Sequence, residues 1–420
     1  MPITPFALNK NDIPLYGLVC ALLRQEANQE NLKLAEAFEK TCSNSHQIKR
    51  LLSALRAHGA LGKACGWIEQ HHPVVLGGLP QVFGLSHSLK QKAEKTWEQG
   101  QTLIGLLEKA GIQAKALKGP WLSEILYGFR HWRLSDDIDL FIPAPQLGQA
   151  VEALLHCGYK MAWYPRQSQL DILIKNECEL SFYHPMQPVP LEIHWRALPR
   201  AYPGFLGCIE KGDHNLEESK VSEEWQWLYL LAHGGLKHGF DRLAHIYEPY
   251  TLSRKNTFNI SWARQLAQIH GLGALVNRAE QLHIFAESLF DSTHFSARNK
   301  NHVPGDLDKK SCHMALQAWF SDDVPEQGVL PEGNDRQKSS DRGDIPSVQK
   351  KIIPTWRFLS EMLGWPVGIR YLFYRAVLPS YYDVRFFNLP KCLSFMYIWV
   401  KAIRKLVWSF DKSKAFRDVT

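Results

Sequence analysis

The stretch RLSDDIDLFI, residues 133–142, places three carboxylates directly before an apolar run typical of a buried strand. Neighbouring carboxylates repel one another and resist leaving water. Strand side chains alternate between faces, so Asp137 and Asp139 point to one side, while Asp136 and Ile138 point to the other. Two carboxylates on one face suit Mg²⁺ or Mn²⁺, because hard oxygen ligands bind these ions and the ion relieves the repulsion. The alternative is an acidic loop that caps the next helix.

A further acid lies in a second apolar strand, LEIHW. Glu192 sits inside this run, so its carboxylate is buried unless a partner meets it. An adjacent strand carrying Asp137 and Asp139, bridged by a cation, would supply that partner. Three carboxylates from two strands can hold the two cations used for in-line attack on a phosphate. The alternative is a salt bridge from Glu192 to Arg196. His194 lies on the same side as Glu192 and can hydrogen-bond near the site.

A strand-to-helix turn, ALKGPWL, precedes the acids. Backbone N–H groups at such a turn bind phosphate, and Lys118 adds positive charge. Gly119 lets the backbone approach a ligand closely. Alone, this turn is equally typical of an ordinary connection between a strand and a helix.

Composition bounds the protein class. The chain has 420 residues, of which 45% are hydrophobic and 22% charged, and these are globular values. Its eight cysteines include no C-x-x-C pair, so a zinc ribbon is not indicated and reduced thiols in the cytoplasm are expected. We expect no cleaved signal peptide and no membrane span. The net charge of +7 is local, because residues 351–420 hold twelve Lys or Arg against four Asp or Glu.

The hydrophobic pattern divides the chain into regions. Apolar positions at three- and four-residue spacing predict helices before residue 111 and again after Ser222. Between them, short strands and helices form a compact α/β unit. A polar, Gly- and Pro-rich stretch is typical of a disordered or flexible loop. The predicted regions are an N-terminal helical region (1–111), a core (112–200), a helical region (201–320), a flexible loop (321–350) and a basic helical C-terminal segment (351–420).

The order of these motifs resembles the minimal nucleotidyltransferase fold of the DNA polymerase β superfamily. More closely, it is similar to a bacterial family of uncharacterised nucleotidyltransferases. The shared blocks are LKG, LYG, R-x-x-D-D-I-D-L, LEIHWR, HGGLKHGFDRL and the basic RYLFYRAVLPSYYDVRFF. They cover most of residues 112–250 and 365–410. The resemblance implies an α+β fold, with a minimal nucleotidyltransferase core, a mixed sheet and flanking helical regions.

The resemblance also implies an activity. Asp137 and Asp139 would be the metal pair and Glu192 the third carboxylate, binding Mg²⁺ or Mn²⁺. Lys118 and Gly119 would hold the triphosphate of an NTP, most simply ATP, and Arg133 would be a further phosphate contact. A nucleoside monophosphate would pass to an acceptor. A small molecule, a sugar or a protein side chain is favoured over RNA, because the basic charge is not gathered at the carboxylates.

Three positions depart from the family pattern. Proline occupies position 120, where a small residue is usual, and glutamate replaces the commoner aspartate at 192. The block after HGGLKHGFDRL reads AHIYEPY, without the acid expected at its end. The competing hypothesis is a weak or inactive nucleotidyltransferase-fold protein that acts as a binding partner or membrane-surface scaffold.

The C-terminal segment interleaves aromatic and basic residues. One interpretation is a helical cap whose aromatics are buried and whose basic residues are solvated. The other is peripheral contact of residues 365–410 with the inner face of a membrane, because exposed aromatics beside basic residues are typical of interfacial helices. Burial separates the two interpretations. The informative positions are Phe395, Tyr397, Trp399, Lys401, Arg404, Lys405 and Trp408.

Overall fold

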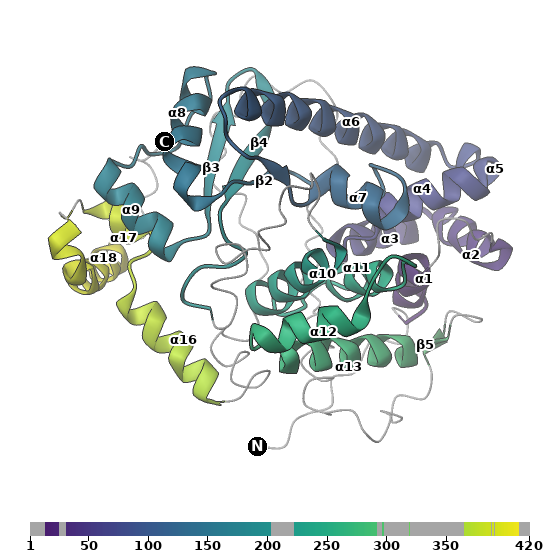
Figure 1. Cartoon of the computed structure of the whole chain (residues 1–420). Helices are drawn as coiled ribbons and strands as arrows, with labels where there is room; N and C mark the ends of the chain where they lie inside the picture. The colour runs from purple at the N-terminus through teal and green to yellow at the C-terminus, as the bar shows by residue number, and fades with distance from the viewer. Residues whose placement is uncertain are drawn as a thin grey trace.

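The computed structural model describes residues 13–24, 31–202, 222–291, 296–297, 319, 365–387, 389 and 391–410. Its N-terminal part is helical, in line with the apolar spacing in this region. The longest of these helices, α6, runs across the top of the molecule in Figure 1, and its first residue is a proline, which helix starts tolerate. These helices are α1 (Ile13–Arg24), α2 (Leu32–Cys42), α3 (Ser45–Ala57), α4 (Leu61–His71), α5 (Pro73–Gly77) and α6 (Pro80–Lys109).

A four-stranded mixed sheet forms the centre of the fold, as predicted. Its order is β1-β2-β4-β3, with β2 and β4 parallel and the two outer pairs antiparallel. The strands are β1 (Lys115–Ala116), β2 (Ile138–Phe141), β3 (Glu179–His184) and β4 (Gln187–His194). The connecting helices are α7 (Gly119–Tyr127), α8 (Leu147–His156) and α9 (Gln167–Asn176). Parallel strands need such a crossover, and α8, α9 and β3 supply it here.

The two faces of the sheet differ in polarity. On one face, Ile138 and Leu140 of β2 meet Leu191 and Ile193 of β4, and all four side chains are fully buried in one apolar core with α6 and α8. On the other face, the alternate positions of the same strands carry the acids. Strand alternation therefore makes one face of the sheet apolar and the other polar.

A second helical region covers the polar side of the core. Gln226 of α10 donates a hydrogen bond to the carbonyl of Leu117 at the end of β1, which joins this region to the sheet. A separate apolar core unites these helices with the N-terminal ones and with α7. The elements are α10 (Glu223–Ala232), the π-helix η2 (His233–Lys237), α11 (Ala244–Ser253), α12 (Ile260–Ile269), α13 (Gly273–Leu289), β5 (Phe290–Asp291) and β6 (Ser296–Ala297).

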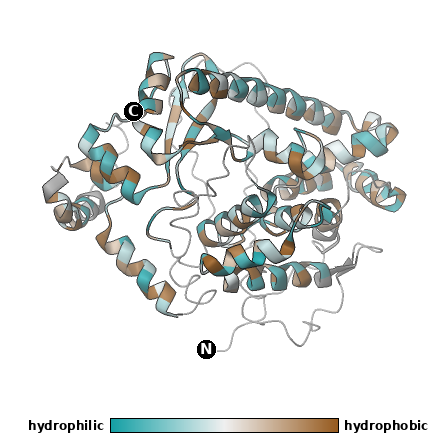
Figure 2. Cartoon of the chain, in the orientation of Figure 1, coloured by the Kyte–Doolittle hydropathy of each residue, from teal (hydrophilic) through white to brown (hydrophobic). Residues whose placement is uncertain are grey.

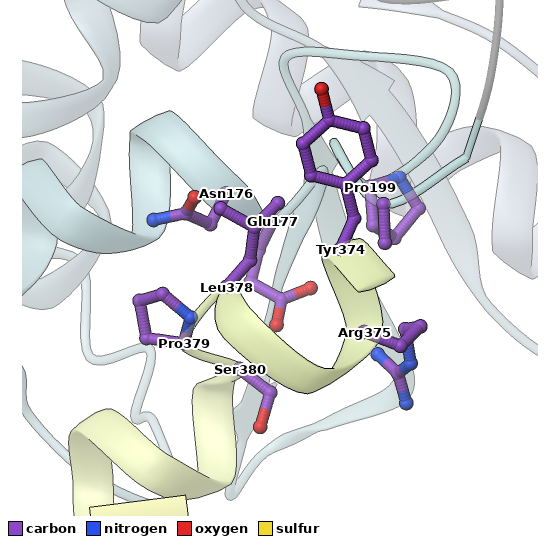
Figure 3. A pocket seen from close by; sticks show the side chains of 9 residues that line it. Asn176, Glu177, Pro199, Tyr374, Arg375, Leu378, Pro379 and Ser380 are labelled. Atoms are coloured by element: carbon purple, nitrogen blue, oxygen red, sulfur yellow. The ribbon is translucent and has the colours of Figure 1, made fainter. Parts of the chain in front are cut away.

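The C-terminal helices pack beside α9, at the edge of the molecule away from α1–α5 (Figure 1). They are α16 (Trp365–Val377), α17 (Tyr381–Phe386), the 3-10 helix η4 (Lys391–Met396) and α18 (Tyr397–Phe410). Val384, Tyr397 and Val400 are buried in the sheet core. Figure 3 shows the joint, a hollow between α16 and the end of α9, where the carboxylate of Glu177 accepts a hydrogen bond from the amide of Tyr381.

The predicted flexible loop, 321–350, lies outside the described residues. Helix α9 is an addition that the hydrophobic pattern did not reveal. Among the described helices, none is both long and apolar enough to cross a bilayer.

In the C-terminal segment, the expectation of solvated basic residues is wrong for two positions. Lys401 and Arg404 are buried, whereas the aromatic side chains of Phe395 and Trp399 are exposed. The side chains of Lys405 and Trp408 lie outside the described part of the chain.

Candidate functional site

The register of β2 and β4 brings two acids side by side. Asp139 is the direct partner of Glu192 across the parallel ladder, so both side chains leave the same face of the sheet. One ligand atom each from Asp139, Glu192 and His194 lie within 4.8 Å of one another. In the part of the chain that the structure describes, no other group of three acids, histidines or cysteines is gathered in this way.

Asp139 is almost completely buried, with 2% of its surface exposed. Its Oδ1 accepts two charged contacts, from Lys118 Nζ at 3.1 Å and from His194 Nε2 at 2.8 Å. Its Oδ2 is buried and has no hydrogen-bond partner among the described residues. A buried carboxylate oxygen without a partner is costly, unless a ligand approaches it.

Opposite charges dominate the electrostatics of this group. Burial favours the neutral acid, but the charge of Lys118 and the bond from His194 hold the pKa of Asp139 well below its usual range. Burial also lowers the pKa of His194, but the bonds to Asp139 and Glu192 outweigh it and raise that pKa to about 8. The imidazole is therefore a cation at neutral pH.

Asp137 lies immediately before β2, beside the cluster but not within it. Its Oδ1 accepts a hydrogen bond from the hydroxyl of Ser135 at 2.9 Å. Burial, together with the charges of Asp139 and Glu192, raises the pKa of Asp137, so the three carboxylates share one electrostatic environment. Asp136 faces away, with 97% of its side chain exposed, and pairs with Lys92. Asp136 and Asp137 both precede β2, so the separation of Asp136 from the other two aspartates comes from the bend before the strand and not from the predicted strand alternation.

The LKG turn adopts the geometry of a helix start. Lys118 is the extended residue that precedes α7, and Gly119 has φ +64°, a conformation that favours glycine. Pro120 falls in the first turn of α7, where a missing N–H breaks no helical bond. The Lys118 ammonium lies 5.6 Å from the ring centre of Tyr229 on α10, so the second helical region closes over this turn.

The guanidinium of Arg133 is already paired with a carboxylate, whereas a free phosphate contact would be unpaired. Its Nε donates a hydrogen bond at 2.9 Å to Glu248 of α11, whose carboxylate is 6% exposed. Although burial alone would lower it, the charge of Glu248 raises the pKa of Arg133. Arg133 thus joins α11 to the site, and a phosphate would share the guanidinium with Glu248.

Two further residues complete the polar network and were missed in the sequence. Lys237 of η2 pairs with Glu179 of β3 at 3.2 Å, and Glu179 lies 3.5 Å from the second ring nitrogen of His194. His194 therefore stands between Glu179 and Asp139. The sequence shows a lysine in HGGLKHGFDRL and an acid at the first position of a strand. Nothing in the sequence indicates that these two residues form a pair.

The donor set fits a divalent cation. Within the described part of the chain, Asp139 Oδ2 lacks a hydrogen-bond partner. Glu192 is half-buried beside it, and the charges of Asp139 and Glu192 both act on Asp137. Carboxylate oxygens suit Mg²⁺ and Mn²⁺ equally, and the protonated imidazole of His194 donates to Asp139 rather than offering a ligand atom.

Comparison with known proteins gives one match. A family model described as an uncharacterised nucleotidyltransferase matches residues 44–291, more than half of the chain. This range contains the sheet, the carboxylates and α10–α13. No curated protein and no solved structure matches.

Proposed function

We propose an activity from one premise: the chain belongs to the family of uncharacterised nucleotidyltransferases. The proposed reaction transfers a nucleoside monophosphate from an NTP to an acceptor and releases pyrophosphate. The observation that carries the proposal is the pairing of Asp139 with Glu192 on the polar face of the sheet, where one oxygen of Asp139 has no hydrogen-bond partner among the residues that the structure describes. Paired carboxylates on adjacent strands are the ligands that metal-assisted phosphate chemistry requires.

Substrate binding falls to the turn and its surroundings. Lys118 and the free amides at the start of α7 are proposed to hold the triphosphate, since a helix N-terminus and an ammonium both attract anions. Arg133 is the proposed additional phosphate contact, held in place by Glu248. Asp137, Asp139 and Glu192 would hold Mg²⁺ or Mn²⁺, which supplies charge neutralisation of the phosphates and polarisation of the reacting oxygens.

The chemical step is an in-line displacement. An acceptor hydroxyl attacks the α-phosphorus, a new P–O bond forms, and the bond to the β-phosphate oxygen breaks. Glu192, with 27% of its side chain exposed, is the most accessible carboxylate of the cluster and is proposed to orient the hydroxyl and take its proton. Asp139 is too deeply buried and too strongly paired to serve as that base.

The substrates are proposed by chemical class. ATP is the proposed nucleotide, and a small molecule, a sugar or a protein side chain is the proposed acceptor. Lys118 and Arg133 are each already paired with a carboxylate, so the site offers few cations to a long polyanion such as RNA.

One observation favours the alternative of an inactive or weak member that binds a partner or acts as a membrane-surface scaffold. Lys118 and His194 already place two positive groups on Asp139, and they compete with a metal ion for that carboxylate. A protein that no longer binds a cation would gain stability from this arrangement.

A cytoplasmic location, including the inner face of a membrane, is a further proposal. Five described cysteines are free thiols, and four of these are buried. Such thiols are typical of a reducing compartment.

The test is incubation of the full chain with each α-³²P-labelled NTP, Mg²⁺ or Mn²⁺, and a host extract, followed by identification of labelled products. We expect one labelled acceptor with the wild type and with Asp136→Asn, which changes an exposed carboxylate outside the cluster. Asp139→Asn should give none. If no product forms and equilibrium dialysis detects no metal-dependent NTP binding, the inactive alternative is correct.

A further inference from the structure

Helix α18 carries its apolar face outward. Ile398, Trp399 and Ile403 are 40%, 67% and 55% exposed, and they lie on one side of the helix. The opposite side, with Tyr397, Val400, Lys401 and Arg404, is buried. An ordinary surface helix has the reverse arrangement, with its apolar stripe inside and its charges in water.

An ion cluster holds α18 in this orientation. Arg404 Nε donates to Asp383 Oδ1 at 2.8 Å, and Lys401 Nζ lies 3.4 Å from Asp383 Oδ2. Lys401 also donates to the carbonyls of Arg375 and Leu378 at the end of α16. Rotating α18 to bury its apolar face would break these contacts and strand Asp383. The outward apolar face is therefore a fixed property of the fold.

Neighbouring elements extend this face. On α16, Ile369, Leu372 and Phe373 are exposed at helical spacing. On η4, Phe395 is 71% exposed. These elements contact α18 directly, and Figure 2 shows hydrophobic colour on α16 and α18 at the same edge of the molecule. We call this set the C-terminal apolar surface; its residues are Trp365, Ile369, Leu372, Phe373, Phe386, Phe387, Leu393, Phe395, Met396, Ile398, Trp399 and Ile403.

The charges around this surface have one sign. Among the described side chains of residues 365–404, those charged groups that reach solvent are arginines: Arg370 and Arg375 are exposed and Arg385 is half-buried. The single acid of these side chains, Asp383, is fully buried. Outside these residues, the neighbouring helix α9 carries the half-buried Asp171, and Glu177, which follows α9, is half-buried in the joint of Figure 3.

We propose that the C-terminal apolar surface lies on an anionic bilayer, with Trp399 and Phe395 among the lipid headgroups and Arg370 and Arg375 beside the phosphates. Exposed aromatics beside exposed arginines are features of interfacial helices. A second copy of the chain is a poorer occupant, because a two-fold contact would bring the same arginines together. This proposal does not depend on nucleotidyl transfer. It also corrects the sequence-based expectation, since Lys401 and Arg404 face inward and act as an anchor for α18.

The test is co-sedimentation of the full chain with vesicles of phosphatidylcholine alone or of phosphatidylcholine with phosphatidylglycerol in equal parts. We expect pelleting with the anionic vesicles, and we expect it to weaken as salt rises. Trp399→Ser should reduce the partition coefficient by about tenfold or more, and Arg370→Gln by about fivefold. The matched control is Val74→Ser, which removes an apolar side chain that is 87% exposed on α5, away from this surface.

Fluorescence provides a second measurement that needs no destabilised variant. Brominated phosphatidylglycerol should quench part of the tryptophan emission of the wild type, and Trp399→Phe should lose that part. Failure of the wild type to pellet with anionic vesicles overturns the proposal. So does unchanged pelleting of folded Trp399→Ser. A concentration-dependent dimer in analytical ultracentrifugation that Trp399→Ser abolishes would assign the surface to a second copy instead.

Discussion

Asp139 in the sheet and Asp383 in α17 are both buried aspartates, but they differ in how many of their carboxylate oxygens have hydrogen-bond partners. Asp383 is fully buried, and both of its oxygens are used: Oδ2 accepts from the amide and hydroxyl of Ser380, and Oδ1 accepts from Arg404. Asp139 is nearly as buried, yet its two cationic partners share Oδ1, and Oδ2 has none among the described residues. Among the described residues, Asp383 thus has partners on both carboxylate oxygens, whereas Asp139 has partners on one.

The difference teaches how to separate a structural acid from a functional one. Burial opposes the charge of both acids, and in both cases partners outweigh burial and lower the pKa. A shifted pKa alone therefore does not distinguish them. What distinguishes the two aspartates is that Asp139 Oδ2 has no partner among the described residues, whereas both oxygens of Asp383 have one. Most buried acceptors in folded proteins have a donor, so an exception calls for an explanation.

The largest expected effect is the loss of activity on substitution of Asp139, the aspartate with one oxygen unpaired among the described residues. Asp139→Asn should lower the rate of nucleotidyl transfer by about 10³-fold, which corresponds to about 4 kcal/mol of transition-state stabilisation. Single-turnover kinetics with labelled ATP measures this rate, and circular dichroism checks that the variant is folded. Asp136→Asn is the matched control, with a rate within about twofold of the wild type. Equal losses in both variants would contradict the assignment.

Substitution of Asp383, whose two oxygens both have partners, should lower stability and leave activity nearly unchanged. Asp383→Asn leaves Lys401 and Arg404 buried beside a neutral amide, so the free energy of unfolding should fall by about 3 kcal/mol. Urea denaturation measures this loss. Transfer activity per folded molecule should stay within about twofold of the wild type. A variant that keeps full stability but loses activity would erase the contrast between the two aspartates.

An intermediate effect concerns pH. Because the folded pKa of His194 is raised to about 8, its contribution is fully present below its unfolded pKa of about 6.5 and is lost as pH rises through about 8. In EDTA, the stabilisation that depends on His194, taken as the difference in free energy of unfolding between the wild type and His194→Gln, should therefore fall by on the order of 2 kcal/mol between pH 6 and pH 9. The total free energy of unfolding has a different slope, because burial lowers the pKa of His58, His131, His238 and His283, and these groups add stability as pH rises through about 6.5. The contributions of Asp139 and Asp383 do not change in this window, because their lowered pKa values place their loss at acid pH. Parallel urea titrations of the wild type and of His194→Gln across this pH range measure that difference, and a difference that does not change with pH would contradict the assignment.

The smallest expected effect concerns the orientation of Asp137. Ser135→Ala removes one hydrogen bond to its carboxylate, worth about 1 kcal/mol. We expect about fivefold weaker use of Mg²⁺, with the full rate recovered at saturating metal. Activity titrated against Mg²⁺ measures this effect. A loss that excess Mg²⁺ does not restore would show that Ser135 acts through the backbone rather than through Asp137.

Local pattern was sufficient for part of the site. The alternation of DIDLFI set Asp139 opposite the apolar Ile138 and Leu140, and LEIHW placed Glu192 and His194 on one face. These statements follow from strand geometry, which a single sequence displays. The mixed sheet and the family were also predicted from the motif order, and both are confirmed.

Long-range partners were out of reach. Nothing near Arg133 in the sequence indicates Glu248, and nothing near Glu179 indicates Lys237, because these pairs form only when α11 and η2 close over the sheet. The inward turn of Lys401 was missed for the same reason, since helical spacing shows that two faces differ but not which face is buried. Asp383 decides that question from another helix.

The parallel pairing of β2 with β4 also determines when Asp139 and Glu192 can come together during folding. Asp139 and Glu192 belong to strands between which α8, α9 and β3 must first be made. Until β4 has been synthesised, Asp139 has no Glu192 beside it. Such non-local pairings form late in folding. A chain synthesised only as far as β3 therefore lacks the complete carboxylate pair. The pair forms with β4, so a metal ion held by both acids would bind only after the four-stranded sheet has formed.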